Sequence, residues 1–78
     1  MDTRDKLQEI FRQVFDDEEI EIARETTADD IDGWDSLSHM NLIVAVEMGF
    51  SIRFNTKDIR ALKDVGDLIN IVDKKLAG

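Results

Sequence analysis

Apolar residues recur along most of the chain at the three- and four-residue spacing of helices. In the first segment this spacing joins Leu7, Ile10, Phe11, Val14 and Phe15. With about 100° between successive residues, they form a single stripe, which is typical of a helix that buries one face in a core. The pattern predicts a helix over about residues 4–15, with Thr3 or Asp2 placed to cap it.

Three further helices are predicted by the rest of the pattern. A second helix is expected over about residues 36–48 and ends at Gly49, and a short third one over about 57–61 is capped by Thr56. Asp64 caps a fourth helix that ends near residue 76. The stripe of this last helix is Val65, Leu68, Ile69, Val72 and Leu76. We therefore expect one all-α domain over residues 1–78, a four-helix bundle with three longer helices and a short third one.

A long, mostly acidic segment, residues 16–35, separates the first two predicted helices. A loop of this length in a compact domain is usually functional or held in place by its own side chains. Ile20, Ile22 and Ile31 are the residues expected to hold it on the core. Alternation around residues 19–22 resembles a short strand, but no partner strand is evident, so we expect an extended loop.

The predicted second helix differs from the others because it has two apolar faces. One face carries Leu42, Ile43, Val46 and Phe50, and the other carries Leu37, Met40, Val44 and Met48. Either both faces are buried because the helix is central, or the second face is a surface on which partners dock. Methionines suit a surface that accepts several partners.

Composition and charge argue against several classes of function. The formal net charge is −8, and residues 1–35 carry 13 acidic and 4 basic side chains. Such a surface repels phosphate backbones, so no nucleic-acid partner is expected, whereas a basic patch on a protein is attracted. Cysteine is absent, which excludes a disulfide framework and a thiol nucleophile. No stretch is long enough for a membrane span, and the charged start lacks the apolar core of a signal peptide, so a cytoplasmic location is expected.

Ser36 lies where the acidic segment gives way to the second helix. A serine at or next to the N-cap commonly accepts a hydrogen bond from a free backbone N–H. The same free N–H groups and the helix dipole also favour a phosphate at this point. The residues alone leave both interpretations open.

The run Gly33-Trp34-Asp35-Ser36-Leu37, followed by an apolar helix with Glu47 and Phe50, resembles the acyl carrier protein family. That family has Asp-Ser-Leu at the head of its second helix. The resemblance extends over nearly the whole chain and includes its length, acidity, helix pattern, long first loop and short third helix.

The resemblance implies that Ser36 is esterified by 4′-phosphopantetheine. A phosphopantetheinyl transferase, served by magnesium, transfers the group from coenzyme A. The thiol of the arm then holds an acyl or aminoacyl group as a thioester. By this resemblance the protein is a monomeric carrier and not an enzyme, and its further partners are a loading ligase and downstream transferases or synthases. A short acyl chain is expected to fold back between the helices, near the second apolar face.

Partner recognition is assigned to residues around and along the second helix. They are Asp35, Leu37, Met40, Val44, Glu47 and Phe54. The familiar fatty-acid carriers have acidic residues along this helix, where the present chain has Ser38, Asn41, Met48 and Gly49. Arg53 adds a positive charge where the family often has an acid. These departures favour a stand-alone carrier of a dedicated pathway, such as polyketide synthesis, surface-sugar or lipid modification, or aminoacyl transfer.

The same residues also bear on other functions. Ser36 and His39, the only histidine, suggest a hydrolase, but no orienting group or oxyanion hole accompanies them. We expect His39 to pack against the long loop and form a hydrogen bond there. Trp34 is expected to anchor that loop, or else to contact the arm or the transferase. The main alternative to a carrier is an unmodified helical module that binds partners through Leu37, Met40 and Val44.

The acidic run at residues 29–33 superficially resembles a calcium-binding loop. When Gly33 is aligned with the glycine of that loop, the first and last ligand positions fall on Ala28 and His39. Two essential carboxylates are then missing, so no specific metal site is expected. Loose binding of divalent cations by the run remains a hypothesis.

Overall fold

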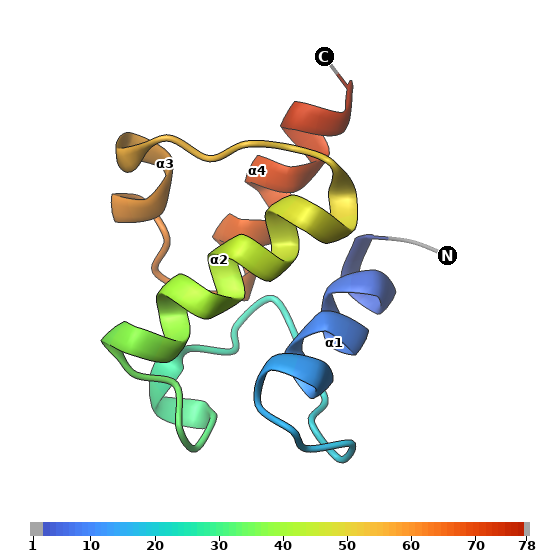
Figure 1. Cartoon of the computed structure of the whole chain (residues 1–78), viewed down its shortest axis with the longest axis vertical. Coiled ribbons are helices and arrows are strands. Elements are labelled where there is room, and N and C mark those ends of the chain that lie inside the picture. The colour runs from blue at the N-terminus through green and yellow to red at the C-terminus, as the bar shows by residue number, and fades with distance from the viewer. Residues whose placement is uncertain (1–2, 78) are drawn as a thin grey trace.

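The computed structural model describes residues 3–77 (Figure 1). Its elements are α1 (Thr3–Val14), the 3-10 helix η1 (Ala28–Asp30), α2 (Ser36–Phe50), α3 (Thr56–Arg60) and α4 (Val65–Ala77). The described part contains no β-strand. The predicted all-α fold, with a short third helix and a long loop before the second, is confirmed.

The core is built from one face of each longer helix together with the loop. Its buried members are Leu7, Ile10, Phe11, Ile22, Ile31, Leu42, Val46, Phe50, Val65, Leu68, Ile69 and Val72. Burying such side chains is the main term that favours folding. The stripes predicted for the first and fourth helices face this core, except that Leu76 is exposed.

The loop between α1 and α2 is held on the bundle as predicted. Ile22 and Ile31 are buried, and Ile20 packs against the core. Guanidinium groups of α1 also bind the loop backbone: Arg4 donates to the carbonyl of Ile22 and Arg12 to that of Ile20, each at 2.8 Å. These contacts fix a long polar segment without a strand.

The end of α2 differs from the prediction. The helix continues through Gly49 to Phe50 and ends at Ser51, whose backbone is left-handed (φ 57°, ψ 46°). Gly49 is a packing residue, because a β-carbon there would lie 2.8 Å from Cδ1 of Ile10 on α1. Gly49 therefore lies where α1 packs closely on α2, and it does not end the helix.

Of the predicted helix caps, that of α3 was wrong and that of α4 is confirmed. Asn55, not Thr56, caps α3, since its side chain accepts from the backbone N–H of Asp58 at 2.8 Å. Thr3 lies inside α1, and Asp2 is outside the described residues.

The predicted cap of α4 is present. The carboxylate of Asp64 accepts from the backbone N–H of Asp67 at 2.9 Å. The first and last helices are also linked directly, because the hydroxyl of Thr3 in α1 donates to the carboxylate of Asp73 in α4.

Candidate functional site: the first turn and outer face of α2

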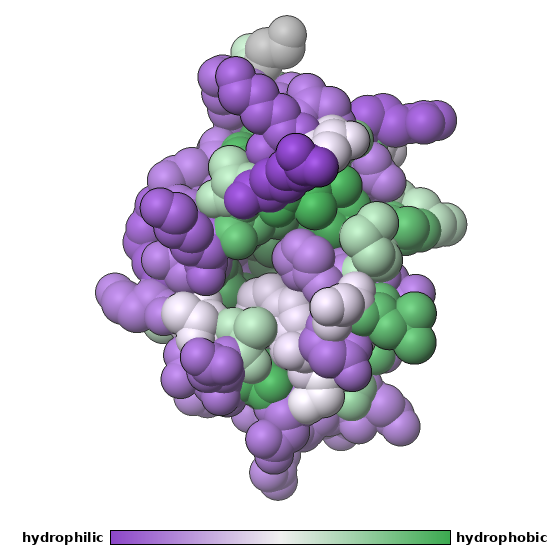
Figure 2. All heavy atoms as spheres, turned by 90° about the vertical axis from the view of Figure 1, so that its left-hand side faces the viewer, coloured by the Kyte–Doolittle hydropathy of each residue, from purple (hydrophilic) through white to green (hydrophobic). Residues whose placement is uncertain are grey.

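The two apolar faces of α2 lie in opposite environments. Leu42, Ile43, Val46 and Phe50 are at most 9% exposed. On the other face Leu37 is 75% exposed, Met40 49%, Val44 51% and Met48 78%. The interpretation in which both faces are buried is therefore wrong, and the second face is surface. Figure 2 views the side with α3 and the start of α2, where hydrophobic side chains surround a hollow in an otherwise mainly hydrophilic surface.

Asp35 caps the N-terminus of α2. Its carboxylate accepts from the backbone N–H of Ser38 at 2.9 Å. Hydrogen bonds from the Ser38 backbone and hydroxyl stabilise the charged form and lower the pKa of Asp35. Ser36 is the first residue of the helix and is not its cap, so the capping interpretation of Ser36 is wrong.

The two serines of the first turn have different surroundings. The Ser38 hydroxyl accepts from the backbone N–H of Asp35 at 2.7 Å and donates to the carbonyl of Gly33 at 2.6 Å. Gly33 adopts φ +86° at this turn, a conformation that favours glycine. Ser36, by contrast, is exposed, and its hydroxyl has no hydrogen-bond partner among residues 3–77. Of the two hydroxyls, only that of Ser36 is free to react.

Trp34 anchors the loop just before this turn. Its ring meets Phe11 edge-on, with centroids 5.3 Å apart, and lies 6.1 Å from Phe15. Its indole N–H donates to Nδ1 of His39 at 3.1 Å. The predicted loop anchor and the predicted hydrogen bond between His39 and the loop are both confirmed. Partial burial lowers the pKa of His39, because desolvation disfavours the imidazolium.

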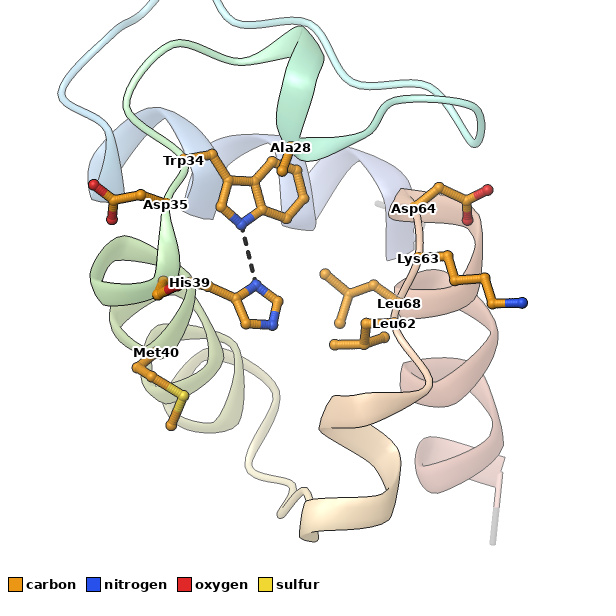
Figure 3. Close-up of a pocket in the computed structure, with 10 residues that line it drawn as sticks. Ala28, Trp34, Asp35, His39, Met40, Leu62, Lys63, Asp64 and Leu68 are labelled. Atoms are coloured by element: carbon orange, nitrogen blue, oxygen red, sulfur yellow. Dashed lines mark hydrogen bonds between the residues drawn. The ribbon is translucent and has the colours of Figure 1, made fainter.

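A cavity of about 580 Å³ opens beside Ser36 (Figure 3). It is lined by Ala28, Trp34, Asp35, Ser36, His39, Met40, Leu62, Lys63, Asp64 and Leu68. The lining combines η1 and the end of the long loop, the first turns of α2, the connection from α3 to α4 and the first turn of α4. Sequence reasoning missed the residues from 62 to 68, because no local pattern shows which distant segment faces Ser36.

The residues predicted to recognise partners form two groups. Asp35, Leu37, Met40 and Val44 lie along the first turns and outer face of α2. Glu47 and Phe54 lie beyond them, where the Glu47 carboxylate accepts from the backbone N–H of Phe54 at 2.8 Å.

Phe54 is itself half-buried against the core. The ammonium of Lys75 also lies 5.9 Å from the centre of its ring. The side chain of Phe54 is thus partly committed to the fold, in contrast to that of Leu37.

Within residues 3–77 no group of three or more histidine, aspartate or glutamate side chains is placed to hold a metal ion. None of the described helices combines the length and the apolar character needed to cross a membrane.

Comparison with known proteins shows similarity to a solved structure. No protein-family model matches the chain, and no curated protein matches it. A similar solved structure is the solution NMR structure of a holo acyl carrier protein from Geobacter metallireducens. The two chains are 60% identical, the match covers 99% of this chain and 88% of that one, and the TM-score is 0.92.

Identity at this level over almost the full length shows that the chain belongs to the acyl carrier protein family. Its function is therefore that of a non-catalytic carrier with covalent 4′-phosphopantetheine as its prosthetic group. Partners of such a carrier include a phosphopantetheinyl transferase, other transferases and synthases.

Proposed function

We propose that Ser36 is the residue that carries 4′-phosphopantetheine, within a single carrier domain spanning residues 1–78. The observation that carries this proposal is the contrast between Ser36 and Ser38. Ser36 presents an exposed, unpaired hydroxyl, whereas the hydroxyl of Ser38 is held by Asp35 and Gly33.

The position of Ser36 also suits the product of the transfer. The Ser36 oxygen forms a bond to the pantetheine-bearing phosphorus of coenzyme A, and the pyrophosphate bond breaks. Adenosine 3′,5′-bisphosphate leaves, and the hydroxyl proton passes to a base of the transferase or to water. The new phosphodiester then lies at the positive end of α2, where unpaired N–H groups favour an anion. Asp35 already occupies the N–H of Ser38, so the N–H groups left for the phosphate are those nearest Ser36.

Intact mass after incubation with coenzyme A and a broad-specificity phosphopantetheinyl transferase tests this assignment. We expect the mass of one phosphopantetheine to be added to the unaltered chain and to Ser38→Ala, and none to Ser36→Ala. Addition to Ser36→Ala, or failure of a folded unaltered chain to gain mass, contradicts the proposal.

We also propose that the carrier serves a dedicated pathway and not general fatty-acid synthesis. The outer face of α2 offers partners few free carboxylates, since its first turn contains no acidic residue and Glu47 binds the backbone of Phe54. Arg53 lines a shallow groove with Val44 and Met48. Partner enzymes that dock here are then expected to use apolar contacts more than basic ones. We further propose that the carrier is a cytoplasmic monomer and that a ligase of the same pathway loads it.

Docking can be compared directly between two kinds of partner. A synthase of general fatty-acid synthesis is expected to bind this carrier more weakly than it binds a carrier with an acidic second helix. Equal binding at physiological salt contradicts the dedicated-pathway proposal, while the assignment of Ser36 stands.

The alternative of an unmodified interaction module requires partners to bind Leu37, Met40 and Val44 regardless of Ser36. Partner binding that is the same for the unloaded chain, the loaded chain and Ser36→Ala favours that alternative.

A further inference from the structure

The lining of the cavity beside Ser36 is mostly apolar, and the imidazole of His39 is a polar group among its apolar side chains. Figure 3 shows the His39 ring beneath Trp34, with Leu62 of the α3–α4 connection and Leu68 of α4 to the right of the ring. Met40 completes the wall on α2. The charged ends of Lys63 and Asp64 point away from the ring in this view. A molecule in the cavity therefore meets hydrocarbon on most sides and an imidazole on one.

The contact with Trp34 determines which nitrogen of His39 carries the proton. An indole N–H is a donor only, so Nδ1, which receives it at 3.1 Å, acts as the acceptor and is unprotonated. In the neutral ring the proton is then on Nε2. Partial burial favours that neutral ring by lowering the pKa of His39.

The Nε2–H of His39 is a donor without a hydrogen-bond partner among residues 3–77. The hydrogen bond from Trp34 is the one that His39 makes through its side chain to other residues between 3 and 77. Nε2 lies on the side of the ring that faces Leu62 (Figure 3). A saturated chain that displaces water from this wall leaves the donor unpaired, which is unfavourable, whereas an oxygen acceptor satisfies it.

We propose that the cavity selects an acyl cargo with an oxygen on its chain, a hydroxyacyl or oxoacyl group, and that Nε2–H of His39 donates to that oxygen. This inference rests on the proposed attachment of the arm to Ser36, which lies on the rim of the same cavity. His39 is then a specificity-determining residue of the carrier, and Trp34 is a positioning residue that fixes the proton on Nε2. Sites built to bind a hydroxyl discriminate against analogues that lack it, because their own polar group is left unpaired.

The acceptor has two possible sources, the cargo and the amide carbonyls of the arm. An arm carbonyl is the same for every cargo, so it satisfies His39 equally whatever is loaded. Only a cargo oxygen makes the protection of the thioester from reagents in solution depend on the chemistry of the acyl chain. A series of cargos of equal length separates the two sources.

The test uses the chain loaded by the transferase from the coenzyme A thioesters of hexanoate, 3-hydroxyhexanoate and 6-hydroxyhexanoate. The rate at which hydroxylamine cleaves each thioester is measured and divided by the rate for the same thioester on free pantetheine. We expect at least one hydroxyacyl form to be cleaved several-fold more slowly than the hexanoyl form. Equal normalised rates for all three cargos overturn the inference.

Two variants identify the residue responsible. His39→Phe keeps an aromatic ring but removes the donor, and we expect the normalised rates to converge. His39→Gln retains a side-chain N–H, and we expect part of the difference to remain. Selectivity that persists in His39→Phe overturns the role of His39.

NMR spectroscopy of the unaltered chain gives a readout that does not depend on the variants folding. The chain has one histidine and one tryptophan, so the ring nitrogens of His39 and the indole N–H of Trp34 each give a single set of signals. We expect the Nε2 signal to shift between the hexanoyl and hydroxyacyl forms. A shift that appears on adding the bare arm and does not change with cargo assigns the donor to the arm and overturns the inference.

Intact mass separates this inference from the proposed function. A chain that gains the acyl-phosphopantetheine mass without cargo selectivity retains the carrier assignment and loses only the role of His39. A folded chain that gains no mass overturns both.

Discussion

The two faces of α2 have similar side chains and opposite roles. The inner face, with Leu42 and Val46 fully buried, joins α1 and α4 in the core. The outer face, with Leu37 75% exposed and Met48 78% exposed, is covered by nothing among residues 3–77. Apolar residues on the first face stabilise the fold, whereas on the second they are available to partners beside Ser36. Hydrophobicity alone therefore did not distinguish the core face from the exposed face of this helix.

The largest difference between the two faces is expected in the free energy of unfolding. Leu42→Ala removes a completely buried side chain and should lower this free energy by about 2–5 kcal/mol. Val44→Ala, on the outer face, should change it by less than about 0.5 kcal/mol. Urea denaturation of both variants measures the difference, and similar losses contradict the assignment of the faces.

A smaller difference in the free energy of unfolding is expected between variants of Asp35 and of its neighbour Ser36. Asp35→Ala removes the cap of α2 and is expected to cost about 0.5–2 kcal/mol. Ser36→Ala removes a hydroxyl that has no hydrogen-bond partner in the described part of the chain, and it should cost less than about 0.5 kcal/mol. A larger loss in Ser36→Ala than in Asp35→Ala, measured by the same denaturation, contradicts the assignment of the cap.

Stability should also fall on mild acidification because of His39. Its pKa in the folded chain is lowered by desolvation, so the unfolded chain binds the proton first. Stability is then highest above the unperturbed histidine pKa of about 6.5 and is lost as pH falls from there toward the lower folded pKa. Protonation also removes the acceptor for Trp34 at Nδ1.

His39→Gln keeps an acceptor for the indole but does not titrate. Its melting temperature should depend less on pH between about pH 7 and pH 5 than that of the unaltered chain. Identical pH profiles contradict this account. Asp35 also has a lowered pKa, but its contribution to stability is lost only in more acidic solution, as pH falls from the unperturbed aspartate pKa through the lower folded pKa.

The smallest effect on stability is expected from Val44→Asp. The side chain is 51% exposed, so an aspartate there remains hydrated and the melting temperature should be nearly unchanged. Docking of the transferase should nevertheless weaken, seen as a higher KM for the carrier with kcat retained. Unfolding of this variant, or an unchanged KM, contradicts the docking role of the outer face.

Local sequence patterns predicted the helices because capping and apolar spacing are local properties. Asp64 capped its helix as expected, and Ile22 and Ile31 hold the long loop. The predictions that were wrong concern features that tertiary packing determines. Gly49 allows α1 to approach α2 instead of ending the helix.

In the candidate site, too, local features were predicted from the sequence and long-range contacts were not. The position of Ser36 at the head of α2 followed from the motif and the helix pattern. The facing wall, with Leu62 and Leu68, did not follow, because the chain must fold before residues so distant in sequence meet. Similarly, the spacing of Ser36 and Ser38 did not reveal that Ser38 is bound to the turn at Gly33.

The central claim is that α2 presents Ser36, and not Ser38, for modification. Fragmentation mass spectrometry of the loaded, unaltered chain tests it most directly, because one proteolytic peptide contains both serines. The account predicts that fragments containing Ser36 carry phosphopantetheine and that fragments beginning at Leu37 do not. Phosphopantetheine found on Ser38 contradicts it.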